Sequence, residues 1–309
     1  MRHLRVIPAF LKLGRLQFLF GGVVLHCLGV MMALYTGTSL DPAAFLWGQI
    51  AITATQLMTH YANDYFDLEA DQQNETPTKW SGGSRVLVEN KLPEQVALVT
   101  AIILAAVAFT ANIVLSTLIR PGIATFLLLF LAQSLAWFYS APPVRLHSLG
   151  LGEATTMIIV TILTPLTGYY LQTGTFALLP LLAVVPLSCF QFAMLLAIEF
   201  PDAEGDQFAN KRTLVVRFGA QTAAHFYIAL IVLAYLVLPL LVSAGLPALV
   251  AASVALLSPL GIWQIWHMGQ GDWQRPSRWN ALAFYSIVLL MGSSLAELGA
   301  FTLLVGLAL

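Results

Sequence analysis

One polar segment, NDYFDLEAD, concentrates carboxylates directly after a long apolar run. Asn63, Asp67 and Asp71 are four residues apart, so a continuing helix would place them on one face about a turn apart. Like charges this close repel one another unless a cation joins them. Hard oxygen ligands at this density suit Mg²⁺, which is normally shared with substrate phosphates. Lys79 and Arg85 follow the segment and could contact such a phosphate.

A second acidic segment, EFPDAEGDQFANKRT, repeats the pattern much later in the chain. Glu199, Asp202 and Asp206 stand at i, i+3 and i+7, again one helical face, although a proline and a glycine within the segment leave its geometry open. Lys211 and Arg212 follow at once, where a phosphate bound to the metal would need positive charge. The two segments together predict one site for a metal ion and a phosphorylated substrate.

The composition places this chemistry in a membrane. Only 9% of the residues are charged and 59% are hydrophobic, and the mean hydropathy is +0.82. A soluble domain is nearer half apolar and a quarter charged, so lipid must cover much of this chain. Cys27 and Cys189 both lie within apolar runs, which indicates neither a disulfide framework nor a metal site. We predict a lipid bilayer as the environment, no nucleic-acid partner and no obligatory protein partner.

Charge-free runs of about 20 residues, the length that crosses a bilayer, indicate nine transmembrane helices. Two boundaries, at QTGT and SAGLP, are inferred from Gly and Pro punctuation. The predicted spans are residues 16–36, 43–62, 95–118, 121–140, 153–172, 176–197, 219–243, 246–267 and 280–303. The predicted fold class is an all-α integral membrane protein with about nine helices around a central cavity.

The chain reads as a single polytopic membrane domain, residues 1–309. Four spans separate the two acidic segments, which suggests a first four-helix half at 16–140, a second at 153–267 and a ninth helix at 280–309. This division is topological, since no sequence repeat supports it.

Basic residues predict the orientation. With nine spans, every Lys and Arg except Arg120 falls on one side of the membrane. The positive-inside rule makes that side cytoplasmic, and we expect a multi-pass protein of the plasma membrane. Either acidic segment alone would pass for an ordinary solvated loop. The two acidic segments have similar carboxylate spacing and lie on the same side of the membrane, which favours a single site formed by both.

At these residues the chain resembles the UbiA superfamily of intramembrane aromatic prenyltransferases. The first acidic motif of that family, NDxxDxxxD, appears here at residues 63–71, and the second, DxxxD followed by a basic-Thr element, at 202–213. Between them, WFYSAPPVRLHSLGLGE at 137–153 matches the family's Tyr-Ser-x-Pro-Pro-x-Arg stretch and the Gly-Glu that opens the fifth span. The resemblance runs from Arg15 to at least Gly219. It implies a UbiA-like bundle with a lateral opening to lipid.

The resemblance also implies the chemistry. Mg²⁺ would join the two motifs to a polyprenyl diphosphate, and metal ions and cationic side chains would neutralise the departing diphosphate oxygens. The implied metal ligands are Asn63, Asp67, Asp71, Asp202 and Asp206. The implied diphosphate and cavity residues are Arg15, Tyr139, Arg145, Lys211 and Arg212, with Lys79 and Arg85 nearby. The expected catalytic set is Asp67, Asp71, Asp202, Asp206, Arg145 and Glu199.

Four further polar residues receive separate interpretations. Glu199 stands where menaquinone-branch members often carry Asn, so it is open to three roles: a metal ligand, a base for the ring proton, or a structural group. Asp64 points off the predicted ligand face. His60 precedes Asn63 by three residues and is placed to face the site. Glu297, counted at ~1.5 Å per residue, falls near the far interface of a ~30 Å core and predicts a snorkelling or interfacial role.

The acceptor is the least determined part of the function. The segment SGGSRVLVENKL looks more like the menaquinone branch than the 4-hydroxybenzoate branch, whose loop typically runs Asn-Arg-Pro. We therefore favour polyprenyl transfer to 1,4-dihydroxy-2-naphthoate, an aromatic quinone precursor that would lose its carboxylate as CO₂. The alternatives are 4-hydroxybenzoate, homogentisate, a chlorophyllide, haem or a glycerophosphate lipid precursor.

Two other classes of protein compete with an enzyme. A cation-coupled secondary transporter would carry its charges near the bilayer midplane, whereas here the clustered charges lie at one interface. A non-enzymatic membrane scaffold is disfavoured because the predicted ligand set looks intact.

Overall fold

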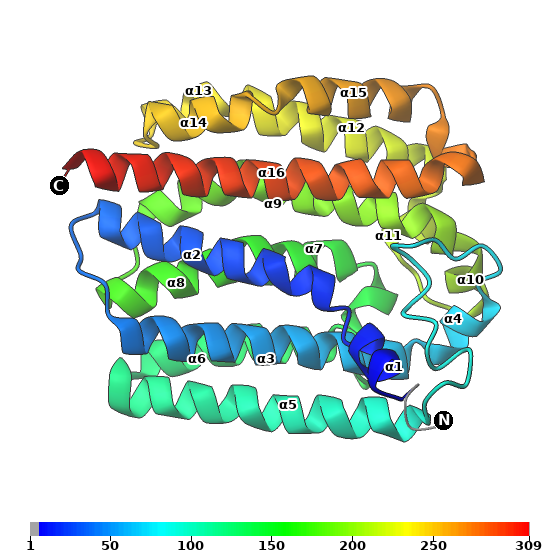
Figure 1. Ribbon diagram of the computed structural model, residues 1–309. Helices are drawn as coiled ribbons and strands as arrows, with labels where there is room; N and C mark the ends of the chain where they lie inside the picture. Colours follow the sequence, from blue (N-terminus) through cyan, green and yellow to red (C-terminus); the bar gives the residue numbers. More distant parts are fainter. Residues whose placement is uncertain (1–5, 309) are drawn as a thin grey trace.

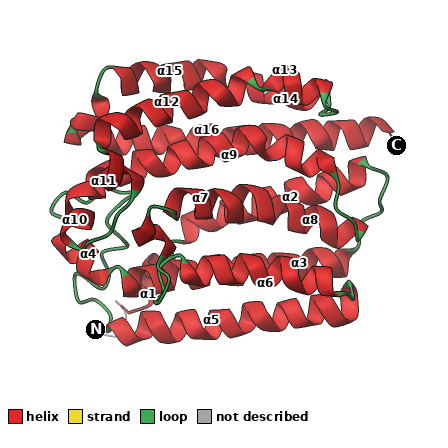
Figure 2. Ribbon diagram, turned by 180° about the vertical axis from the view of Figure 1, so that it is seen from behind, coloured by secondary structure: helices red, strands yellow, loops and turns green. Residues whose placement is uncertain are grey.

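The structure is a computed structural model that describes residues 6–308, and every regular element within that range is a helix. Long helices lie side by side, and the chain crosses the bundle in alternating directions (Figures 1 and 2). The all-α fold predicted from the apolar runs is confirmed. The multi-pass character of the protein follows from the length and apolar composition of these helices.

Each of the nine predicted ranges is helical over most of its length, although several helices extend beyond the predicted bounds. In chain order they are α2 (Leu19–Tyr35), α3 (Pro42–Phe66), α5 (Glu94–Val114), α6 (Ile123–Phe138), α7 (Gly152–Met157), α8 (Thr164–Thr173), α9 (Leu178–Glu199), α12 (Ala220–Leu236), α13 (Leu238–Ser243), α14 (Ala248–Ala255), α15 (Ser258–Gly269) and α16 (Pro276–Ala308). Two π-helical segments continue them, η3 (Leu115–Ile119) after α5 and η5 (Ile158–Leu163) between α7 and α8. Several predicted spans are therefore interrupted helices.

The number of spans differs from the predicted nine when length and apolar composition are the criterion. Within residues 6–308, six helical segments qualify, and a seventh qualifies if α14 and α15, bent by 43°, form one span. The helix α6 is apolar but has only 16 residues. The helix α3 has 25 residues but includes polar side chains such as Gln49 and Gln56. Helices that carry polar groups or break within the bundle fall short of a simple apolar span.

Short helices gather at the end of the bundle where α3 and α9 finish. They are α1 (Val6–Leu13), η2 (Leu16–Phe18), α4 (Leu68–Gln73), η4 (Leu146–Leu149), η6 (Phe200–Asp202), α10 (Ala203–Phe208), α11 (Leu214–Phe218) and η7 (Asp272–Gln274). Both acidic motifs lie at this end, which we call the motif end (Figure 1). At the other end, Arg120 donates to the carbonyl oxygens of Leu171 and Gln172 at 2.8 Å.

The helix α3 delivers the first motif to that end. Its start is fixed by the Asp41 carboxylate, which accepts from Ala43 and Ala44 backbone N–H groups, and by a proline at its first position. It ends at Phe66, and α4 begins after Asp67. Across this break, Asp67 N–H still donates to Asn63 O at 2.9 Å and Asp71 N–H to Asp67 O at 2.9 Å. The helical i to i+4 hydrogen bonds therefore continue from Asn63 through Asp71.

Close helix contact holds the middle of the bundle together. A Cβ atom on Gly29 of α2 would come within 1.9 Å of the Pro165 carbonyl oxygen of α8. A Cβ on Gly168 of α8 would come within 2.4 Å of the His26 carbonyl oxygen. Small residues at such contacts let helix backbones approach closely in a membrane, where packing replaces the hydrophobic effect as the driving force. The absence of side chains at both positions therefore sets the distance between α2 and α8.

The interfacial role predicted for Glu297 is wrong. Its side chain is fully buried within α16, and both carboxylate oxygens lack a hydrogen-bond partner among the described residues. Counting helical rise along the sequence gives no information about which side of α16 packs against the bundle. Glu297 points inward.

The α2–α8 contact gives a stability prediction. Gly29→Ala should destabilise the protein by about 1–3 kcal/mol, because the new methyl group must displace the Pro165 carbonyl. The matched control is Gly299→Ala in α16, where a Cβ meets no atom within 4 Å and better helix propensity adds roughly 0.5–1 kcal/mol. Thermal unfolding in detergent measures both variants. Equal unfolding temperatures for the two would show that the contact is looser than described.

Candidate functional site

The two acidic motifs meet at the motif end of the bundle. The Asn74 amide donates to Asp202 Oδ1 at 2.6 Å, and Gly82 N–H donates to Asp202 Oδ2 at 3.1 Å. Thr76 Oγ1 also donates to the Pro201 carbonyl at 3.3 Å. The loop that follows the first motif therefore holds the first carboxylate of the second. Figure 1 shows α4 and α10 beside each other there.

Lys211 joins the motifs directly. Its Nζ lies 3.1 Å from Asp67 Oδ2 and 3.3 Å from Asp206 Oδ1, across 144 positions of sequence in the first case. Burial alone would lower the pKa of this lysine, but Asp67 and Asp206 outweigh burial and raise it well above its ordinary value. Lys211 therefore stays protonated, and its charge holds one carboxylate from each motif.

Asp67 is the most fully compensated carboxylate of the site. His147 Nε2 lies 2.6 Å from Asp67 Oδ1, and the Asn63 amide donates to Asp67 Oδ2 at 2.7 Å. Burial would raise the pKa of Asp67, but Lys211 and His147 outweigh it and the pKa falls below its usual range. His147, whose Nδ1 lies 2.7 Å from Ser148 Oγ, was not predicted. The signal for it was its place two residues after the Tyr-Ser-x-Pro-Pro-x-Arg stretch, within the matching segment 137–153.

Arg15 contacts the first two residues of the first motif. Its guanidinium forms an ion pair with Asp64 and donates to Asn63 Oδ1 at 3.3 Å. Asp64 is buried and also accepts from the backbone N–H and the hydroxyl of Ser84. Asp64 was predicted to point off the ligand face. It binds both Arg15, which was predicted to contact the diphosphate, and Ser84 in the SGGS loop. His60 Nδ1 lies 2.8 Å from the Gly14 carbonyl oxygen, so it contacts the N-terminal segment.

Asp71 is less well compensated. Burial raises its pKa well above the ordinary value, and repulsion from Asp67 and Asp64 adds to this effect. The Arg85 guanidinium donates to the Asp71 backbone carbonyl rather than to its carboxylate. A Cβ on Gly83 would come within 1.9 Å of Asp71 Oδ2, so the glycine loop packs directly on this carboxylate. A cation arriving at the site would relieve the repulsion.

The donor set matches the chemistry of a hard cation, although it is not arranged as a ready metal cluster. No group of three or more His, Cys, Asp or Glu side chains within residues 6–308 is disposed to hold a metal ion. Lys211 occupies the space between Asp67 and Asp206, so a positive charge already stands where the carboxylates converge. Carboxylate and amide oxygens are the ligands that Mg²⁺ prefers. The residues therefore fit Mg²⁺ once Lys211 moves aside.

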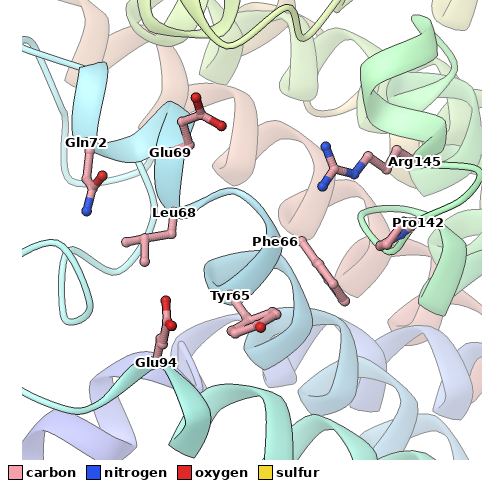
Figure 3. A pocket seen from close by; sticks show the side chains of 8 residues that line it. All are labelled: Tyr65, Phe66, Leu68, Glu69, Gln72, Glu94, Pro142 and Arg145. Atoms are coloured by element: carbon pink, nitrogen blue, oxygen red, sulfur yellow. The ribbon is translucent and has the colours of Figure 1, made fainter.

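Arg145 does not join this cluster. It is exposed and lines an open pocket of about 530 Å³ with Tyr65, Phe66 and Glu69 (Figure 3). Arg145 adopts a left-handed backbone conformation, with φ of 50°. The structure thus places the predicted diphosphate arginine among aromatic and acidic side chains.

Arg212 and Lys79 are also exposed. Arg212 lines a second pocket of about 420 Å³ together with Lys211 and Arg217. Lys79 Nζ lies 5.0 Å from the centre of the Trp80 ring, and its backbone N–H donates to Asn280 at 3.0 Å. Of the predicted basic residues, Arg15 and Lys211 contact side chains of the acidic motifs.

Tyr139 packs beside the compensated carboxylate. Its ring meets His147 edge-to-face, with 5.2 Å between ring centroids. Tyr139 gives this side of the site an aromatic wall that carries one hydroxyl group.

Comparisons with known proteins agree with this arrangement. The model of the UbiA prenyltransferase family matches residues 23–288. Among solved structures, the chain is similar to that of a digeranylgeranylglyceryl phosphate synthase, with 16% identity, a TM-score of 0.64, and 96% of this chain and 99% of that chain covered. No curated protein sequence matches the chain.

Two archaeal structures are also similar. A UbiA homologue from Aeropyrum pernix K1 shares 18% identity with a TM-score of 0.65, covering 88% of this chain and 96% of that one. A UbiA homologue from Archaeoglobus fulgidus, bound to DMAPP and Mg²⁺, shares 14% identity with a TM-score of 0.56, covering 93% and 98%. At these identities the likeness establishes a common fold.

The Lys211 contacts give a second stability prediction. In metal-free buffer, Lys211→Met should cost about 3–5 kcal/mol, because two buried aspartates lose their shared counter-charge. Lys91→Met, which removes an exposed pair with Glu89, should leave the unfolding temperature unchanged. Denaturant unfolding in detergent compares the two. If both variants unfolded alike, Lys211 would not be the charge that joins the motifs.

Proposed function

Because the chain belongs to the UbiA prenyltransferase family, we propose that this prenyltransferase moves a polyprenyl chain from polyprenyl diphosphate to an aromatic quinone precursor and releases diphosphate. The observation that carries the proposal is the meeting of the two acidic motifs on Lys211. A single polar site at one end of an apolar bundle suits a substrate that is half diphosphate and half hydrocarbon. The diphosphate then lies at the motif end and the chain lies among the helices.

We assign Mg²⁺ as the cofactor. The homologue from Archaeoglobus fulgidus was solved with Mg²⁺ and DMAPP, and the donor set described above has the matching chemistry. The proposed ligands are Asn63, Asp67, Asp71, Asp202 and Asp206. When bound, the metal neutralises charge that builds on the departing diphosphate oxygens.

The basic residues of the site would bind the diphosphate and attract or release it. Once the carboxylates are otherwise neutralised, the Lys211 ammonium becomes free to contact a phosphate oxygen, and Arg15 lies on the other side of Asn63. Arg212 and Arg217 line the open pocket beside Lys211 and would attract the anion or release it. The surrounding bilayer excludes water, which would otherwise capture an allylic cation.

We favour 1,4-dihydroxy-2-naphthoate as the acceptor, with loss of its carboxylate as CO₂. The support is the segment 81–92, whose sequence resembles the menaquinone branch. That segment contacts both motifs, since Ser84 contacts Asp64 in the first and Gly82 contacts Asp202 in the second. A loop in this position is suited to recognise the acceptor.

A glycerophosphate acceptor is the second candidate. The fold likeness to a digeranylgeranylglyceryl phosphate synthase favours it, and so does the basic pocket lined by Lys211, Arg212 and Arg217. An acceptor that carries its own phosphate would find positive charge there. The remaining phenolic acceptors have no separate observation in their favour.

We further propose that the motif end faces the cytoplasm in the plasma membrane. Lys12, Lys79, Lys211 and Arg275 lie in or beside the short elements of that end, whereas Arg120 lies at the other. The positive-inside rule then gives the orientation. Cysteine labelling of Lys79→Cys from the cytoplasmic side tests it, and labelling only from outside would reverse the assignment.

The activity can be tested with purified protein, radiolabelled geranylgeranyl diphosphate, Mg²⁺ and a panel of acceptors. Transfer should require Mg²⁺ and be strongest with the naphthoate. Asp67→Asn and Asp202→Asn should each lower turnover by about 10²–10³-fold, the size of loss seen when charge stabilisation of a transition state is removed. Glu75→Gln, an exposed acid in the same loop, serves as the control and should retain activity.

Three results would contradict parts of this proposal. Full activity in either aspartate variant would remove that residue from the metal site. Transfer to a glycerophosphate acceptor alone would select the second candidate. Product formation unaffected by chelation of divalent cations would overturn the Mg²⁺ assignment.

A further inference from the structure

Two glutamates behind the acidic motifs form a buried carboxyl pair. Glu153 lies in the first turn of α7 and is fully buried, and Glu199 is the last residue of α9 and is 8% exposed. The helices α7 and α9 pack against each other, and Glu153 is the first neighbouring residue to act on the Glu199 carboxyl. Each keeps one oxygen, Oε2, without a partner among the residues that the structure describes. Buried carboxyl oxygens without a hydrogen-bond partner are rare in a folded interior.

The two members of the pair are not equivalent. Glu153 Oε1 accepts from the Leu214 backbone N–H at 2.9 Å, so this residue is fixed to the start of α11. Glu199 has no such backbone contact at the orphaned oxygen and stands three residues before Asp202. The charged and titratable groups around it are Glu153, Asp206 and Lys211. Tyr139 shares the same surroundings, since Lys211, Glu199 and Glu153 all act on it.

The proposed reaction needs a proton acceptor at this place. A phenolic or alcoholic acceptor attacks poorly as the neutral hydroxyl compound, so its proton must pass to another group. A carboxylate within reach of the hydroxyl solves this problem, and general bases of this kind contribute about 10²–10⁴-fold to rate. A purely structural pair would use Glu153 to hold Leu214 and would leave no reason for a second acid against it.

We propose that Glu199 is the base that takes the hydroxyl proton of the acceptor, and that Glu153 positions it. This inference rests on the proposed prenyl transfer. The O–H bond of the acceptor breaks, and its proton passes to a Glu199 oxygen. In the naphthoate, the electron pair left on oxygen is shared with the ring, and the ring carbon that bears the carboxylate forms the new bond to C1 of the prenyl group. The bond from that carbon to the carboxylate then breaks, CO₂ leaves, and the electron pair returns to the ring as the oxygen recovers its proton from Glu199. In an alcohol acceptor the oxygen itself forms the bond to C1. The bond from C1 to the diphosphate oxygen breaks, and its electron pair leaves with diphosphate.

The test varies the acidity of the acceptor. Glu199→Gln is compared with wild type on the parent acceptor and on ring-fluorinated versions whose hydroxyl groups ionise more readily. With the parent acceptor, kcat should fall by about 100-fold, while KM for the prenyl diphosphate stays within about twofold because this step follows its binding. The more acidic acceptors should recover most of the lost rate. Glu153→Gln should show the same dependence with a smaller loss.

Glu297→Gln is the matched control, since it removes another buried carboxyl without partners, on α16 and outside the acidic motifs. It should leave kcat unchanged with every acceptor. If Glu199→Gln does not fold, Glu199→Asp keeps the carboxylate one methylene shorter and should show a smaller loss with the same dependence on acceptor acidity.

The outcomes separate this inference from the function on which it rests. A wild-type protein that transfers prenyl groups while Glu199→Gln does so equally well overturns the inference alone. A loss in Glu199→Gln of equal size for all acceptors, or one confined to KM for the prenyl diphosphate, assigns the residue to structure or to the metal site. A wild-type protein that transfers to no acceptor overturns the proposed function itself.

Discussion

A buried carboxyl group stays ionised only with a positive charge nearby, and this requirement organises the motif end of the protein. Lys211 supplies that charge to Asp67 and Asp206 at once, and therefore ties the end of α3 to the segment after α9. Breaking one side of a buried pair costs far more than the pair contributes to stability. The two acidic motifs can thus stay buried and close together only while a cation lies between them, whether an ammonium group or a metal ion.

The packing of the other helices holds the motif end in position. The helices expose apolar surfaces along their length and confine most charges to the motif end, while Arg120 and Asp41 satisfy backbone groups at the other end. Glycines bring α2 against α8. Around the carboxylates, His147, Asn63 and Arg15 occupy the hydrogen-bonding positions that water would fill in a soluble protein. An amphiphilic diphosphate suits this division between a charged end and an apolar interior.

Much of this could be predicted from the sequence, because hydropathy and motif spacing are local properties. The apolar runs predicted the helical class, and the matched carboxylate spacing predicted that the motifs meet. Side-chain direction after a helix ends is a tertiary property, so other features escaped. The left-handed backbone at Arg145 accompanies its placement in a separate pocket that Glu69 and Glu94 line, rather than beside Asp67 and Asp206. His147 lies in a short 3₁₀ turn with no periodicity to mark it, and the inward face of Glu297 depends on neighbouring helices.

The central claim is that both acidic motifs and Lys211 form one cation and diphosphate site. Anomalous diffraction from crystals grown with Mn²⁺ and an unreactive prenyl diphosphate analogue tests it most directly. The account predicts anomalous density between the Asp67 and Asp206 carboxylates, with Lys211 Nζ moved from them onto a phosphate oxygen. Anomalous density on one motif alone, with Lys211 still between the two aspartates, would contradict it.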